Sequence, residues 1–528
     1  MKPAYLKIYF VVLGAFIFNI IFWQEKLGVN TLIFDAFILA VTFYLYQEQF
    51  KKPAVKWLLF AHLVTLVAVI IQNTLLSKMA FSFTILLLIV FIQYEHRSLW
   101  YAAASAVSNY IMAIPSFITG LQQAKKGNLN LYATKKVFRL IVIPLVIVII
   151  FSVLYNFSNS VFHDVINTIG LALENFFNRF FDWFSWSRFW FLLFGMFVTG
   201  GLLLKSGFDL FSKEDIKRKD ILKRTRTDLK QWKKNPLSDI LALIMGKFSS
   251  GIMALRNENT VGIISMILLN GLLFLINWLD IVYVWFGFQY DPKVNLSDYV
   301  HEGAGLLIFS IVLAMLVLLF FFRGNLNFYK KNKWLKMGAY LWIIQNMILV
   351  ISVLFRDYYY IQEYGLAYKR IGVLVFLALV LAGLLTVYIK IKELRTNYFL
   401  LKVNAWVVLT VMVIASCIHW DETIADYNLA RKNSIPLDIK FLLSLSDKAL
   451  PVIEKNQEVL EEKVAGIVPQ GEDEFVYRGA LSPKQYFEMR KKKFFEEQQS
   501  YTWLSWNAAD SYVKEHLQPS PQLTTINK

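Results

Sequence analysis

The chain has 528 residues, of which 57% are hydrophobic and 18% are charged, and its mean hydropathy is +0.47. A soluble globular domain is nearer half apolar and a quarter charged, so that class is excluded. The formal net charge is +17, but residues 421–528 hold 14 Lys+Arg and 17 Asp+Glu. The positive excess therefore lies in the first 420 residues, between apolar blocks, as in the loops of membrane proteins. We expect no nucleic-acid partner.

Eleven apolar blocks predict membrane-spanning helices. Each is long enough to cross about 30 Å of hydrocarbon, and they lack the alternation of barrel strands. We therefore expect an all-α fold, a polytopic helical membrane bundle with about 11 spans, or about 12 if residues 99–120 also cross. The first block is interpreted as a retained span, because no small-residue cleavage site follows it. The blocks lie near 8–23, 30–46, 57–72, 79–94, 140–157, 188–205, 260–283, 303–322, 338–355, 371–389 and 403–419.

Residues 99–120 are less apolar than these blocks and contain Asn109 and Pro115. Lysines mark the loops at 51–56 and 121–139 as cytoplasmic. After the loop at 51–56, the blocks at 57–72 and 79–94 cross the membrane outward and back, so the chain is again inside at residue 99. The loop at 121–139 can then be inside only if residues 99–120 do not cross. We therefore expect this segment to be interfacial or re-entrant. The same alternation places the N-terminus in the cytoplasm and the C-terminal tail outside it.

Three segments differ from the spans. Residues 158–187 carry apolar side chains at steps of three and four, which predicts an amphipathic outer interfacial helix, either a lid or lateral gate or a passive anchor. The basic cytoplasmic loop 206–259 either binds anionic lipid or a protein partner, or only fixes the topology. The tail 420–528 is expected to be helical, with breaks at Pro436 and Pro451, and Trp503 and Trp506 suggest that it packs on the membrane helices. The remaining predicted units are N-terminal membrane helices at 1–157, one span at 188–205 and C-terminal membrane helices at 260–419.

Charged residues near the outer ends of several spans share one predicted depth. Charges close to hydrocarbon are costly unless they are paired or hydrated, so we expect an ion-paired network at the outer mouth of the bundle. Arg356 is placed to reach Asp280 or Glu302, and Glu363 is placed to pair with Arg370. The network is either a binding site, proton relay or gate, or a set of charges that only closes helix ends. Its candidate residues are Asp280, His301, Glu302, Arg356, Asp357, Glu363 and Arg370.

Asp35 is the one acid in the middle of a predicted span in the first half of the chain. Its role is either functional or that of a hydrogen-bonded structural acid. Other polar side chains within spans, His62 among them, fit hydrogen bonds between helices. The single cysteine, Cys417, allows no disulfide within the chain and no thiolate cluster. Because no metal-ligand spacing or nucleotide motif occurs, we expect neither a metal nor another cofactor.

Three stretches together resemble a bacterial multi-pass membrane family known only as domain of unknown function 4173, close to 4153. They are YVHEGAGLLIFSIVLAMLVLLF from residue 299, VLFRDYYYIQEYGLAYKRIGVLVF from 353 and HWDETIADYNLARKNSIPLDIKFLLSLSD from 419. This chain has His301-Glu302-Gly303 where the family often has Arg-x-Gly. The resemblance implies a membrane fold and no particular activity. The matching residues are Tyr299, Gly303, Arg356, Tyr360, Tyr364, Gly365, Leu366, Arg370, Asn428, Leu429 and Arg431.

Three functions fit these observations. The first is transport or a channel, with the outer polar cluster receiving a solute or ion. The second is a non-enzymatic subunit, sensor or assembly factor of a membrane complex, with a protein partner bound through loop 206–259 or the tail. The third is a membrane-embedded enzyme acting on a lipid-linked substrate, which is disfavoured because the first outer loop, at about 24–30, has the single acid Glu25 and so offers no paired carboxylates for acid–base work. We expect the bacterial cytoplasmic (inner) membrane as the location and membrane lipids as neighbours.

Overall fold

The structure is a computed structural model of the whole chain. It describes residues 4–124, 185–224, 254–286, 296–322, 324–461 and 481–517, together with isolated positions between 144 and 170. Within these ranges the fold is all-helical, as predicted, and the one β-type pairing is an isolated bridge between Ile221 and Arg395. Part of the predictions lies outside the described residues: most of the 140–157 block, the 158–187 helix and the centre of loop 206–259.

A first group of helices comes from the N-terminal part of the chain. They are α1 (Ala4–Phe22), α2 (Val29–Tyr46), α3 (Pro53–Ile71), α4 (Leu75–Gln93), α5 (Leu99–Ile111), α6 (Ala113–Ala124) and α9 (Trp186–Leu203). α1 packs along α9, and α3 packs along α4. Buried side chains such as Val11, Ile38 and Leu88 fill the space between them. Large apolar side chains, Trp57 and Phe60 among them, remain exposed on the outer faces, as expected for helices that border lipid.

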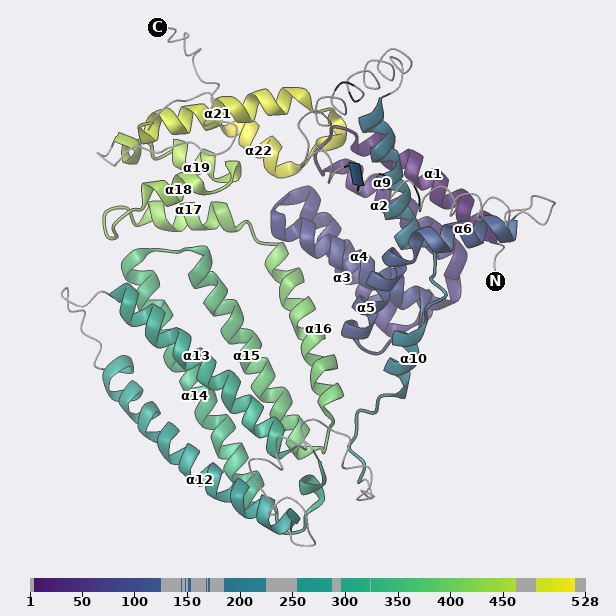
Figure 1. Cartoon of the computed structure of the whole chain (residues 1–528). Helices are drawn as coiled ribbons and strands as arrows, with labels where there is room; N and C mark the ends of the chain where they lie inside the picture. The colour runs from purple at the N-terminus through teal and green to yellow at the C-terminus, as the bar shows by residue number, and fades with distance from the viewer. Residues whose placement is uncertain are drawn as a thin grey trace.

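A second group comes from the C-terminal part and lies beside the first (Figure 1). It contains α12 (Ala254–Asp280), α13 (Leu296–Phe321), α14 (Lys333–Tyr364), α15 (Tyr368–Lys392) and α16 (Asn397–Ser416). α14 is the centre of this group, since α12, α13 and α15 all pack against it. α16 connects the two groups, because it packs on α15 and also on α3, α4 and α5. Leu409 of α16 accordingly belongs to the core of the N-terminal group.

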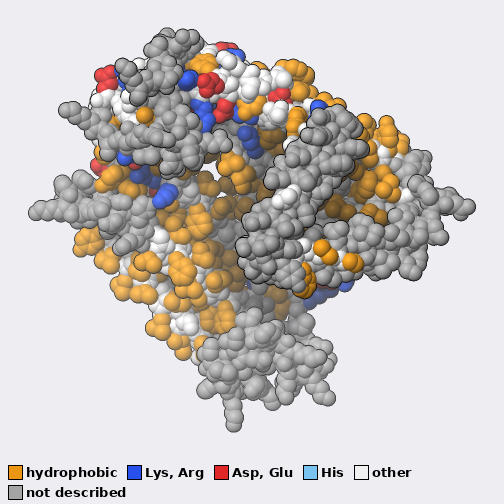
Figure 2. Space-filling model, turned by 45° about the horizontal axis from the view of Figure 1, so that its top comes forward, with side chains coloured by type: hydrophobic (Ala, Val, Ile, Leu, Met, Phe, Trp, Pro, Cys, Tyr) orange, Lys and Arg blue, Asp and Glu red, His pale blue; other side chains and the backbone are white. Residues whose placement is uncertain are grey.

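The tail folds over one end of the membrane helices (Figure 1). Its helices are α17 (Trp420–Ala430), α18 (Ile439–Ser444), α19 (Leu450–Glu454), α21 (Pro483–Ser500) and α22 (Ala508–His516). They share a core that includes Ile424, Phe487 and Val513, and Ile371 of α15 also belongs to it. Figure 2 shows charged side chains gathered over this part and apolar ones over the helices below it. Pro451 does not break a helix as expected, because it occupies the first turn of α19, where a missing N–H costs nothing.

The described loops fall at two opposite ends of the bundle. At the tail end, Lys26 of the α1–α2 turn pairs with Glu497 at 2.7 Å, and Gln72 of the α3–α4 turn donates to the carbonyl of Cys417 at 3.2 Å. At the other end, called the basic end, lie the lysine-rich turns 47–56, 205–224, 324–336 and 390–402, with the α4–α5 turn 94–98 among them. Trp503 and Trp506 are 69% and 49% exposed, so the tail rests on the helices mainly through other groups.

The predicted blocks other than 140–157 coincide with described helices, but their number as spans is not confirmed. Eight described helices are long and apolar enough to cross a membrane, and α5 with α6 makes a ninth if the bent pair counts as one span. α5 and α6 meet at an angle of 57°. Pro115 lies in the first turn of α6, where proline is tolerated. The bend is that of a broken span or a re-entrant loop, so the expectation that 99–120 does not cross stays a prediction.

Candidate functional site

A polar network lies inside the N-terminal helices, near the middle of α3 and α4. His62 Nε2 is 2.8 Å from Asp35 Oδ1 on α2, and its Nδ1 is 3.0 Å from the hydroxyl of Thr84 on α4. Thr65 lies 2.8 Å from Thr84 and donates to the carbonyl of His62 at 2.9 Å. The side chains of Asp35 and His62 are 1% and 0% exposed. Three neighbouring helices thus bring one acid, one imidazole and two hydroxyls together.

The local sequence explains why this network is internal. Asp35, Ile38 and Thr42 recur at steps of three and four on α2, and all three are buried, so they form the face that α2 turns towards its neighbours. The ring of His62 also lies against Phe81, with centroids 5.1 Å apart. Asp35 Oδ2 and the hydroxyl of Thr42 have no hydrogen-bond partner within the described part of the chain. A buried oxygen without a partner is costly, and at a functional site it is a place for a proton or a ligand.

A second buried pair lies in the C-terminal helices. Arg356 of α14 forms an ion pair with Asp280 at the end of α12, and both side chains are at most 9% exposed. Asp357, the next residue of α14, is also buried. Arg356 was predicted to reach either Asp280 or Glu302, and in the structure its partner is Asp280. The side chains of His301 and Glu302, like those of Tyr299 and Gly303, lie outside the described part of α13.

Glu363 and Arg370 do not form the predicted ion pair in the described structure. Arg370 instead donates to the carbonyl oxygen of Tyr364 at 2.9 Å and to that of Gly365. Its guanidinium also stacks over the ring of Tyr360 at 4.1 Å, a cation–π contact. The sequence-predicted outer cluster is therefore split: Asp280 and Arg356 are in contact, whereas Arg370 holds the turn between α14 and α15.

That turn is joined to the tail by the residues that carried the family resemblance. Asn428 of α17 accepts from the backbone N–H of Leu366 at 2.6 Å and donates to its carbonyl at 2.9 Å. Gly365 has φ +78°, a backbone angle that other residues rarely adopt. A side chain at this position would also collide with Oδ1 of Asn428. Arg431 donates to the carbonyl of Gln362 at 3.2 Å. Motifs about sixty residues apart in sequence thus meet in one joint, which we call the α14–α15/α17 joint.

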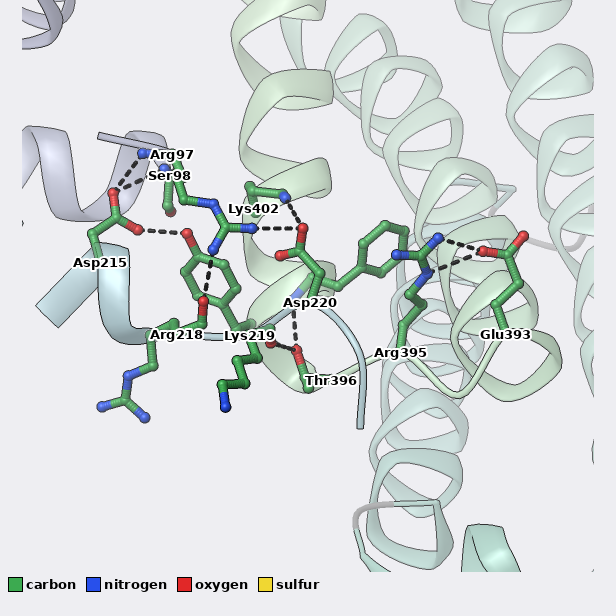
Figure 3. Close-up of polar contacts among 12 residues, drawn as sticks. Arg97, Ser98, Asp215, Arg218, Lys219, Asp220, Glu393, Arg395, Thr396 and Lys402 are labelled. Carbon is green, nitrogen blue, oxygen red and sulfur yellow. Dashed lines mark hydrogen bonds and ion pairs between the residues drawn. The ribbon is translucent and has the colours of Figure 1, made fainter. Parts of the chain in front are cut away.

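At the basic end, a segment of the 206–259 loop fastens the two helix groups together (Figure 3). Asp215 of α10 (Leu210–Lys217) accepts from the backbone N–H groups of Arg97 and Ser98 at 2.7 and 3.1 Å and from the hydroxyl of Tyr398 at 2.5 Å. His96 Nδ1 lies 3.1 Å from the same carboxylate. Burial alone would raise the pKa of Asp215, but the hydrogen bonds that it accepts outweigh burial and hold its pKa below the usual value.

Asp220 continues this contact a few residues later (Figure 3). Its carboxylate pairs with Arg97 at 2.8 Å and with Lys402 at 2.6 Å. Its carbonyl oxygen accepts from the backbone N–H of Thr396 at 2.9 Å. We call residues 215–222 with these partners the basic-end clasp, because they bind the α4–α5 turn on one side and the α15–α16 turn on the other. Asp215 and Asp220 were not predicted as site residues, since acids within a basic run give no signal of their own.

The described helices and their buried polar groups define a multi-pass, all-α membrane protein. No cluster of side chains suited to a metal ion occurs among the described residues. The model of a domain of unknown function, DUF4153, matches residues 33–456, and the chain belongs to this family. The resemblance inferred from the three motifs is thus confirmed for the 4153 family, over a longer range than the motifs themselves. No curated protein and no solved structure matches the chain.

Proposed function

We propose that this protein is a proton-coupled membrane transporter in which the Asp35–His62 pair carries the proton. The observation that supports the proposal is the complete burial of this pair across three apolar helices. An ionisable group at such a depth costs several kcal/mol unless it is paired, and such groups mark proton and substrate pathways in many membrane proteins. Histidine and carboxylate together can share one proton or bind a second one near neutral pH.

The arrangement around the pair supports a relay. The Thr84 and Thr65 hydroxyls extend the hydrogen-bonded chain from His62 along α3 and α4, and hydroxyls both donate and accept. Asp35 Oδ2, which has no partner in the described part of the chain, is positioned for a second proton. The Asp280–Arg356 pair is less suited to this role, because arginine stays protonated. We therefore place the proton at the Asp35–His62 pair rather than at the outer cluster of the sequence-based hypothesis.

The proposal is tested by proton flux in proteoliposomes. Purified protein is reconstituted with a pH dye inside, a potassium diffusion potential is imposed, and an ultrafiltered extract of small cellular solutes is supplied outside. We expect dye acidification in the wild type and a fall to the level of empty vesicles in Asp35→Asn, which preserves size and hydrogen bonding but not the titratable group.

The matched control is Asp426→Asn, the same change at an exposed position of α17, where a surface substitution has little effect on stability. This variant should retain the wild-type flux. Equal flux in wild type and Asp35→Asn, or a wild type no more permeable than empty vesicles, contradicts proton coupling at this site.

We also infer that the basic end faces the cytoplasm of a bacterial cell and that the tail lies outside the cytoplasmic membrane. The support is the gathering of lysine-rich turns at one end, which the positive-inside rule associates with the cytoplasm. Cys417 is exposed at the tail end and is the sole cysteine. A membrane-impermeant maleimide should therefore label intact spheroplasts, and Cys417→Ser should not be labelled. Labelling only after lysis would reverse the inferred orientation.

A further inference from the structure

A cavity of about 350 Å³ lies beside the α14–α15/α17 joint, between the start of α15 and the tail helix α18. Lys369 and Arg370 line one part of it, together with the phenol of Tyr368. Because α15 is a candidate membrane span that begins at Tyr368, its first turn is at the boundary between hydrocarbon and water. Tyrosine is common at that depth. The cavity therefore opens where the headgroups of the surrounding lipid lie.

The lining of the cavity also contains apolar side chains. Leu366 follows the turn, and Leu437 and Phe441 come from the tail segment above it. A lining that holds both cations and apolar side chains matches a molecule that has an anionic head and an apolar chain. A free inorganic anion would leave the apolar part in contact with water, which is unfavourable.

The charges of the cavity favour an anion. Lys369 is exposed and has no carboxylate within ion-pair distance among the described residues. Arg370 donates to carbonyl oxygens and stacks over an aromatic ring, and the acid that interacts with it electrostatically, the buried Asp357, does not line the cavity. Asp438 is the single acid in the lining, and its carboxylate accepts from the backbone N–H of Phe441 at 2.9 Å as the cap of α18. Two cations thus face the cavity against one carboxylate that is already bound.

We propose that this cavity binds an anionic phospholipid, with the phosphate at Lys369 and Arg370 and part of one acyl chain against Leu437 and Phe441. The lipid would contact α15 and α18 at once and so hold the tail on the membrane helices. This role is independent of proton transport, because none of these residues belongs to the Asp35–His62 network. Lysine and arginine side chains at headgroup level attract the phosphates of anionic lipids by their charge.

The test measures lipid binding by native mass spectrometry of the full chain released from detergent micelles. Phosphatidylglycerol is titrated against phosphatidylcholine with the same acyl chains. We expect phosphatidylglycerol to bind more tightly to the wild type, with about fivefold weaker binding in Lys369→Gln and about thirtyfold weaker binding in Lys369→Glu. Lys369 is exposed, so both variants should fold.

Lys440→Gln is the matched control, because Lys440 is an exposed lysine of α18 that does not line the cavity. It should bind phosphatidylglycerol as the wild type does. Equal loss in Lys440→Gln and Lys369→Gln would overturn the proposal, as would equal binding of the two lipids. Displacement of the lipid by inorganic phosphate at the same concentration would show that the cavity takes the free anion, and it would also overturn the proposal.

Discussion

The two groups of membrane helices each bury an acid beside a base, but the bases differ. In the N-terminal group Asp35 lies against His62, and in the C-terminal group Asp280 lies against Arg356. Arginine keeps its charge at all physiological pH values, so the second pair is a permanent ion pair. Histidine, unlike arginine, is a side chain that proteins use as a proton carrier. Similar burial therefore supports a fixed contact in one group and a switchable one in the other.

The difference also shows how each pair fits its surroundings. Asp280 and Arg356 lie near the tail end, where α12 ends and α14 approaches its turn, so water and headgroups are close. Asp35 and His62 are enclosed by α2, α3 and α4. We conclude that the C-terminal pair is suited to holding helices together and that the N-terminal pair is suited to changing its charge.

The largest expected effect comes from removing one partner of the permanent pair. Arg356→Met leaves Asp280 buried without its cation, and the free energy of unfolding should fall by about 3–5 kcal/mol. Replacing both partners, with Asp280→Leu added, should recover most of this loss because neither charge of the pair remains buried. Thermal unfolding of the three proteins in detergent gives the comparison. A double variant as unstable as Arg356→Met would mean that the charges themselves are not what the site requires.

A smaller effect is expected at the switchable pair. In His62→Gln the amide can still hydrogen-bond Asp35, and Asp35 can take up a proton instead of remaining charged. The free energy of unfolding should fall by about 1–3 kcal/mol, the cost of an imperfect buried hydrogen bond. The same unfolding measurement decides the point. If His62→Gln were as destabilising as Arg356→Met, the distinction between the two pairs would fail.

The spans could be predicted from the sequence because apolar length alone identifies them, and α3, α4 and α14 lie where the blocks placed them. The turn at Gly365 was also predictable, since a glycine there allows the observed φ of +78°. The pairing of Asp35 with His62 was not, although each residue was recognised as polar within a span. The two lie 27 residues apart on different helices, and contact depends on how α2 and α3 rotate and slide against each other.

The basic-end clasp was missed for a related reason. The sequence shows acids scattered through a basic run, which is usual for a solvated loop. Asp215 becomes distinctive only when the loop folds back and the carboxylate meets two backbone N–H groups and Tyr398. The bend between α5 and α6 has no glycine or proline at its centre, Met112, so it too depends on packing that the sequence alone does not display.

The basic-end clasp allows a similar comparison outside the hydrocarbon, between the buried Asp215 and the more exposed Asp220. Asp215→Asn replaces a carboxylate whose Oδ2 accepts from two backbone N–H groups and whose Oδ1 accepts from the Tyr398 hydroxyl, and hydrogen bonds to an uncharged amide are weaker than those to a carboxylate. Unfolding free energy should fall by about 1–3 kcal/mol. Asp220→Asn is the partner measurement; its side chain is 21% exposed, and loss of such surface ion pairs should cost about 1 kcal/mol or less. A larger effect at Asp220 than at Asp215 would contradict the importance of burial.

The smallest effect is expected at His419, the water-side counterpart of His62. His419 caps the start of α17, with Nε2 at 3.2 Å from the carbonyl of Gln72 and Nδ1 at 3.7 Å from Glu422. Burial lowers its pKa below the usual value despite the nearby Glu422, and the Lys448 charge acts in the same direction as burial. Between this lowered pKa and about 6.5, the unfolded chain binds more protons than the folded chain.

The stability contributed by the neutral, buried imidazole is therefore complete above about pH 6.5 and is lost as the pH falls through the lowered pKa of His419. The loss should be about 1 kcal/mol or less, since solvent screens the partly exposed site. Unfolding midpoints at pH 7.5 and 5.5, chosen on either side of about pH 6.5, should differ less in His419→Gln than in the wild type. If the two midpoints differed by as much in His419→Gln as in the wild type, the acid sensitivity would come from another group, and the prediction for His419 would be wrong.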